Sequence, residues 1–130
     1  MGLVNLNYID SILSRRKQQH QWYDHALRNL EYQKIEWSGN TIDWNHIYYA
    51  ILLPEKEKLS KMVIELKKNW IYARRYFYPL LSSLGYTSKF VRMTIASDAA
   101  SRVLCLPLHH QLEQEEIDFI ARILLRVQNN

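Results

Sequence analysis

One segment, "HIYYAILLP" at residues 46–54, constrains the fold of this 130-residue chain more than any other. Its β-branched and aromatic residues, and the proline that closes it, predict a strand. Successive side chains of a strand point to opposite faces. One face would carry Ile47, Tyr49, Ile51 and Leu53, and the other Tyr48, Ala50 and Leu52. Because a strand with one solvated face alternates apolar with polar residues, we expect this strand to be covered on both sides.

Helical periodicity flanks the strand. Residues 3–31 predict one long helix, since apolar residues recur at spacings of three and four and include Leu6 and Ile9. At 1.5 Å per residue this helix would be roughly 40 Å long, so we expect it to bridge to another body. Residues 55–69 predict a second helix, with acidic residues at its start, basic residues at its end and Asn69 as a left-handed stop.

The C-terminal half predicts further elements in alternation. We expect a strand at 71–75, a loop at 81–96, a short helix ending at Leu104, a connector at 106–112 and a helix at 113–127. Ser97 or Asp98 is expected to cap the short helix. Two or three strands with helices on one face make an α+β layer over residues 41–130. We therefore expect a single domain, 1–130, whose layer lacks its second cover.

Composition limits the classes of protein to consider. Hydrophobic residues make up 48% of the chain, which allows a core and disfavours disorder. The lone Cys105 excludes an internal disulfide and is expected to be buried as a small hydrophobe. With no apolar run of about 20 residues and no signal peptide, we expect a cytoplasmic protein without membrane contact. The net charge of +4 is spread along the chain, which disfavours a nucleic-acid partner.

Metal and catalytic motifs are not found in the sequence. His20 and His25 are five residues apart and do not align on a helix face, so we expect no metal site. Cys105 with His109 is the only local pairing of a nucleophile with a base, and it lies in no recognisable elbow. Lys89, in "YTSKF", is the least obviously solvated lysine, but nothing nearby supplies a cofactor pocket. We expect no catalytic residue in this chain.

The stretch "WIYARRYFYPL" at residues 70–80 is the best candidate for binding. Arg74 and Arg75 would point to opposite faces, so one can pair inside while the other reaches a ligand. The forked guanidinium suits phosphate, and Tyr76 and Tyr78 add rings and hydroxyls that would suit a nucleotide-sugar. The alternative is that one arginine pairs with a local carboxylate while the tyrosines fill the core.

Four segments, in chain order, match a known pattern. "GLVNLNYIDSILSRRKQQHQWYDHAL" is similar to a long helix with the pattern "L..ID....R+", and "HIYYAILLP" to the strand that follows it. "IYARRYFYPLL" is similar to "GI-x-TR-x-HYPPLH", and "SRVLCLPLHHQLEQEEI" to "A..LSLPLH..LT.EE(V/I)", the most specific of the four. Together they resemble the C-terminal part of the DegT/StrS family of sugar aminotransferases, over nearly the whole chain. These are pyridoxal-phosphate enzymes with the fold of aspartate aminotransferase (fold type I).

The resemblance implies a small C-terminal domain with a long N-terminal bridging helix and a two- to three-stranded sheet covered by helices. Such enzymes move an amino group, usually from glutamate, to a keto group on a nucleotide-linked deoxysugar. "ARRYFYPL" is similar to the branch that makes dTDP-4-amino-4,6-dideoxyglucose. Arg74 falls on the family's arginine, Tyr76 where many members have a histidine near the substrate, and Tyr78 on the first of two prolines. Leu81 replaces the histidine that ends the motif.

The resemblance also implies that much of the enzyme lies outside this sequence. In the family, a large domain carries the cofactor's lysine, the aspartate beneath its pyridine nitrogen and most phosphate contacts. We therefore expect a truncated domain that binds no pyridoxal phosphate and performs no transamination alone. Its exposed apolar surface would meet the large domain and a second subunit, or form a homo-oligomer. Two alternatives stay open: a non-catalytic binding or assembly module that retains the fold, and a small basic nucleic-acid binder.

Overall fold

The computed structural model describes residues 2, 6–35, 44–76, 78–85 and 93–130. Its elements, in chain order, are helix α2 (Ile9–Ala26), strand β1 (Gln33–Lys34), strand β2 (Tyr49–Leu52), helix α3 (Lys56–Lys68), 3-10 helix η1 (Leu81–Ser83), helix α4 (Thr94–Arg102), strand β3 (Val103–Leu106) and helix α5 (Gln114–Gln128). This arrangement confirms the predicted α+β class.

The strands form a three-stranded antiparallel sheet in the order β1-β2-β3. Ile51 pairs with Leu104, and Ala50 pairs with Cys105. A further stretch joins the sheet through one bridge between Arg74 and Cys105. The Arg74 N–H donates to the Cys105 carbonyl at 3.0 Å, and the Cys105 N–H donates to the Arg74 carbonyl at 2.7 Å. Because side chains alternate along a strand, this register assigns each of these residues to one face of the sheet.

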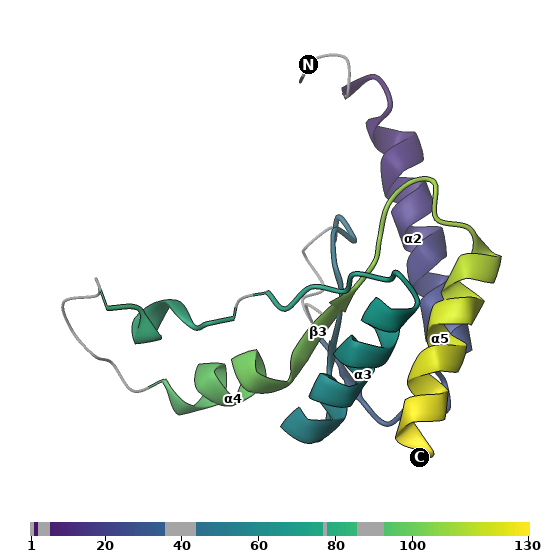
Figure 1. Cartoon of the computed structure of the whole chain (residues 1–130). Coiled ribbons are helices and arrows are strands. Elements are labelled where there is room, and N and C mark those ends of the chain that lie inside the picture. Colours follow the sequence, from purple (N-terminus) through teal and green to yellow (C-terminus); the bar gives the residue numbers. More distant parts are fainter. Residues whose placement is uncertain (1, 3–5, 36–43, 77, 86–92) are drawn as a thin grey trace.

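Helices α2, α3 and α5 lie together on one side of the sheet (Figure 1). The core on that side includes Tyr49, Ile51, Leu104 and Leu106 from the strands, Leu59, Met62 and Leu66 from α3, and Ile117, Ile120 and Leu124 from α5. The apolar residues of α3 and α5 recur at helical spacing, as predicted. On the other face of β2, Ala50 and Leu52 are half-buried and Tyr48 is 44% exposed. The described residues thus cover one face of β2 fully and leave the other partly open.

The predicted long helix is shorter than expected. The predicted range was 3–31, but α2 ends at Ala26 and has 18 residues, about 27 Å. After Ala26 the Leu30 N–H donates to the Leu27 carbonyl, a tighter turn that puts both leucines in the core. At the other end Leu6 and Ile9, two of the apolar residues that recur at helical spacing, are exposed. The N-terminal turn of α2 projects beyond the other helices in Figure 1.

Two predicted boundaries in the C-terminal half were wrong. The segment 103–106, expected to end a helix and begin a connector, is strand β3 with every side chain buried. Ser97 and Asp98 lie inside α4 rather than at its cap, and the Ser97 N–H donates to the Met93 carbonyl. The predicted strand at 71–75 makes only a single bridge. The neighbouring Pro107 has no N–H with which to extend that ladder.

Helix α3 ends in a Schellman motif whose left-handed residue is a tryptophan. Asn69, predicted for this role, has φ −99°, whereas Trp70 has φ 61°. The Ile71 N–H donates to the Leu66 carbonyl and the Trp70 N–H to the Lys67 carbonyl, both at 3.0 Å. Glycine is usual at this position because a left-handed backbone costs other residues roughly 1–2 kcal/mol.

Helix α5 begins with a capping box between its N-cap residue, Glu113, and Glu116.

A partly buried polar cluster ties α2 to β2. The Tyr49 hydroxyl donates to the Asp24 carboxylate at 2.7 Å, and the Tyr49 ring stacks on Tyr23 at 4.6 Å. The buried His20 meets Tyr49 edge-on at 5.0 Å. Burial, followed by the proximity of His46, lowers the pKa of His20 from 6.5 to about 4. The imidazole of His20 is therefore neutral in the folded protein near neutral pH.

Acidification is expected to destabilise the fold through His20. The unfolded state takes up the proton near pH 6.5 and the folded state only near pH 4, so stability is lost as the pH falls between these values. The shift corresponds to about 3 kcal/mol. Urea unfolding at both ends of this range should show a smaller loss for His20→Gln than for the wild type. If the free energy of unfolding fell equally in the two proteins, the lowered pKa of His20 would not be the cause of the loss.

Candidate functional site

A pocket of about 360 Å³ lies on the open face of the sheet. Its lining residues come from the start of β2, from the segment after α3 and from the end of β3: Ile47, Tyr48, Tyr72, Arg74, Tyr76, Cys105, Leu106, Pro107 and Leu108. Arg74 pairs with Cys105, and Cys105 pairs with Ala50, so these three side chains share the face that the helices leave open. The sheet register therefore places Arg74 in this pocket.

Arg74 is the exposed cation of this pocket. Its guanidinium donates to the Tyr76 hydroxyl at 2.8 Å and lies 5.9 Å from the centre of the Tyr76 ring. The Tyr76 ring in turn meets Tyr48 edge-on at 5.4 Å. A guanidinium has five N–H donors in a planar fork. Arg74 can therefore keep its contact with Tyr76 and still donate to an anionic ligand at the surface.

Arg75 is held within the protein instead. Its guanidinium donates to the carbonyls of Ala100 and Ser101, both at 3.2 Å, at the C-terminal end of α4. Carbonyls at a helix C-terminus lack partners within the helix and favour a cation. The same guanidinium lies 3.7 Å from the centre of the Tyr78 ring. Arg75 therefore links the sheet to an arm, defined as α4 and residues 78–85, which extends away from the three helices in Figure 1.

The four predicted binding residues thus fall into two groups, Arg74 with Tyr76 and Arg75 with Tyr78. The predicted divergence of the two arginines is seen, but the partners of Arg75 are backbone carbonyls rather than the carboxylate considered as an alternative. Tyr76 is half-buried and Tyr78 is exposed, so neither fills the core. Sequence reasoning missed Tyr48 as a pocket residue, although the apolar second face of its strand was the available signal. Binding by all four predicted residues stays a prediction.

Cys105 lies beneath this pocket and is buried, as predicted. Burial raises the pKa of its thiol, which disfavours the reactive thiolate. Among the described residues, no three His, Cys, Asp or Glu side chains gather where they could hold a metal ion. In the same part of the chain, no helix is both long and apolar enough to cross a membrane. Lys89 lies outside the described residues.

The described residues do not fit the covalent anchor of pyridoxal phosphate. A lysine that forms a Schiff base needs a desolvated setting that keeps its amine neutral. None of the lysines in the described ranges is buried. The half-buried Lys34 and Lys58 pair with the carboxylates of Asp24 and Glu31 at 2.7 and 3.2 Å.

The chain is a small α+β domain, in which an antiparallel sheet has helices on one face and a pocket lined by an arginine on the other. Residues 1–125 match the DegT/DnrJ/EryC1/StrS aminotransferase family. The chain belongs to that family, which confirms the predicted resemblance.

The chain resembles individual curated relatives in sequence and solved structures in fold. The chain is 34% identical over 131 residues to dTDP-4-amino-4,6-dideoxy-D-glucose transaminase of Escherichia coli, covering 95% of this chain and 35% of that protein. It superposes with a TM-score of 0.88 on the aminotransferase TlmJ from Streptoalloteichus hindustanus, at 19% identity, over 98% of this chain and 35% of the other. With the Helicobacter pylori aminotransferase PseC the TM-score is 0.74 at 25% identity, over 97% of this chain and 35% of that protein. The chain thus spans about one third of the length of the curated relatives it matches.

The adjacent arginines offer a matched test of the division of roles. Arg75→Ala should free the end of α4, because the carbonyls of Ala100 and Ser101 lose their donor. Hydrogen exchange of the α4 amides should then be several-fold faster. Arg74→Ala, one residue away, should leave that exchange at the wild-type rate. Equal acceleration in both variants would contradict a separate structural role for Arg75.

Proposed function

We propose that this chain is part of a pyridoxal-phosphate-dependent aminotransferase that acts on a keto group of a nucleotide-linked deoxysugar, with glutamate as the amino donor. The observation that carries the proposal is the pocket of Arg74, Tyr76 and Tyr48 on the open face of the sheet. Family membership and the activity of the E. coli relative, which is named for a dTDP-linked amino sugar, support this substrate class.

Within such an enzyme the chain supplies substrate-side surface. The exposed Arg74 donates to a phosphate oxygen through its fork, and the rings and hydroxyls of Tyr76 and Tyr48 contact the sugar or the base. Arg75 and Tyr78 position the arm beside this surface. When bound in the intact enzyme, pyridoxal phosphate supplies the electron sink for amino transfer.

The apolar surface of the chain supports a role as one part of a larger assembly. Exposed apolar side chains lie on the arm or next to it, at or just before the first turn of α2, and just before β2: Tyr78, Leu81, Met93, Ile95, Leu6, Ile9, Ile47 and Tyr48. Apolar patches of this kind mark interaction sites. The proposed partners are the large domain and second subunit of the same enzyme, with a homo-oligomer as the state of the isolated chain. Action in the cytoplasm stays a prediction.

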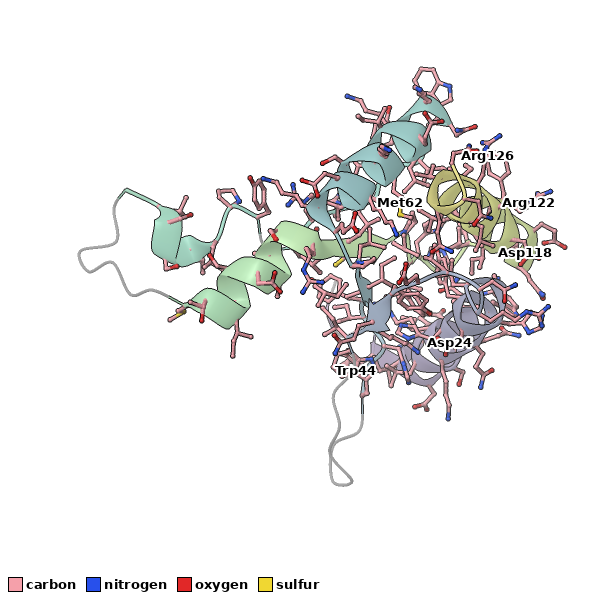
Figure 2. The ribbon with its side chains drawn as sticks, turned by 90° about the horizontal axis from the view of Figure 1, so that it is seen from below. Asp24, Trp44, Met62, Asp118, Arg122 and Arg126 are labelled. Atoms are coloured by element: carbon pink, nitrogen blue, oxygen red, sulfur yellow. The ribbon has the colours of Figure 1, made fainter. Side chains whose placement is uncertain are left out.

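Reconstitution tests the proposal. The E. coli relative would be produced without the third that matches this chain, and the two pieces would be mixed with glutamate and a dTDP-4-keto-6-deoxy sugar. Neither piece alone should form the amino sugar, and the mixture should. Arg74→Ala should lower the rate by about tenfold or more, as expected for a lost charged hydrogen bond. Arg126→Ala is the control, because Arg126 does not line the Arg74 pocket and lies on α5 (Figure 2).

A non-catalytic binding or assembly module that retains the fold is the second candidate, favoured by the exposed apolar side chains of the chain. It predicts that the two pieces sediment together without producing amino sugar. Failure to associate, with the isolated chain sedimenting as a monomer, would count against both candidates.

A further inference from the structure

A second pocket, of about 550 Å³, lies between the C-terminal end of α3 and the N-terminal half of α5. Trp70, Tyr72 and Phe119 contribute three aromatic rings to its lining, and their exposed fractions are 81, 63 and 42%. Tyr72 lies at the boundary with the Arg74 pocket and lines both, whereas Trp70 and Phe119 line only this one. The rings are thus open to solvent around one hollow.

Trp70 is the least expected of these residues. Its left-handed backbone, with φ 61°, is a conformation that glycine adopts without strain and a tryptophan does not. The ring gains no burial in exchange, because most of it faces solvent. Neither local backbone preference nor core packing therefore explains a tryptophan here. What the residue provides is a large aromatic face at the rim of the pocket.

The charge in this pocket is negative, although the chain as a whole carries +4. Glu115 and Glu116 line it from the first turn of α5. The Glu116 carboxylate accepts from the Glu113 N–H at 2.9 Å, which fixes its position. Among the described residues no ion pair holds Glu115. The Arg122 guanidinium of this chain already lies 5.7 Å from the centre of the Phe119 ring, an example of the contact such a surface favours.

We propose that this pocket binds an organic cation, a guanidinium or alkylammonium group. Aromatic faces attract such cations through the ring quadrupole, and a carboxylate beside the rings adds direct attraction. Trp70 and Tyr72 supply the faces and Glu115 the charge. The cation can be an arginine or lysine side chain of a polypeptide or a free polyamine, and the two sources share this chemistry. The proposal concerns a pocket that the proposed aminotransferase function does not use.

Nuclear magnetic resonance of the 130-residue chain tests the ligand class. N-acetyl-arginine methylamide and spermidine would be titrated separately while the indole N–H resonance of Trp70 is followed, its assignment taken from the peak lost in Trp70→Gly. At least one probe should shift this resonance, and the tighter of the two identifies the source. The citrulline analogue, which has the shape of arginine without its charge, should give no shift. No shift with either cation up to tens of millimolar, or an equal shift with citrulline, would overturn the proposal.

Variants test the roles of Trp70 and Glu115. Binding of the cationic probe to each variant would be measured from the broadening of the probe's own resonances. Trp70→Gly should weaken binding about tenfold while keeping the fold, because glycine suits the left-handed position. Glu115→Gln should weaken binding several-fold. Glu57→Gln is its matched control, since Glu57 is likewise the acidic residue in the first turn of a helix, α3, and does not line the pocket. Unchanged binding in Trp70→Gly, or equal weakening in both glutamate variants, would refute the proposed roles.

Discussion

The antiparallel pairing of β2 with β3 determines where the candidate binding groups lie. The pairs Ile51–Leu104 and Ala50–Cys105 divide the side chains into a face packed by the helices and a face left open. The bridge from Cys105 extends this division to Arg74. A shift of one residue would turn every side chain to the other face and would bury the guanidinium among apolar helices, at a high desolvation cost. Core packing therefore fixes the register and, through it, exposes Arg74.

Local patterns in the sequence were sufficient for some elements and not for others. The apolar spacing of α3 and α5 and the burial of Cys105 are local properties, and the structure agrees with them. Strand β3 was missed because "VLCL" directly follows a helix, and a short apolar run does not distinguish a strand from a continuing helix. Without β3 there was no register, so the apolar second face of its strand could mark Tyr48 as a candidate but could not place it beside Arg74.

The two arginines show the same limit on a smaller scale. Alternation along a strand predicts that neighbours diverge, but it does not say which one finds a partner. The contact that decides this joins Arg75 to the carbonyls of Ala100 and Ser101, about 25 residues further along the chain. The end of α3 shows the same limit. The sequence pattern favoured Asn69 as the left-handed residue, but the hydrogen bond from the Ile71 N–H to the Leu66 carbonyl makes Trp70 the left-handed residue instead. Both outcomes depend on the packing of neighbours.

The open face of β2 and the exposed Arg74 depend on each other energetically. In the isolated chain Arg74 is in contact with water, where a charged hydrogen bond to a phosphate contributes little because the dielectric constant is high. A partner that covers Tyr48 and Leu52 would remove apolar surface from water and would also lower the local dielectric constant around Arg74. The attraction between its guanidinium and an anion would then strengthen. Binding of such a partner and binding of an anion at Arg74 are therefore expected to favour each other. Without a partner over Tyr48 and Leu52, the chain can be well folded and still bind a nucleotide-sugar weakly.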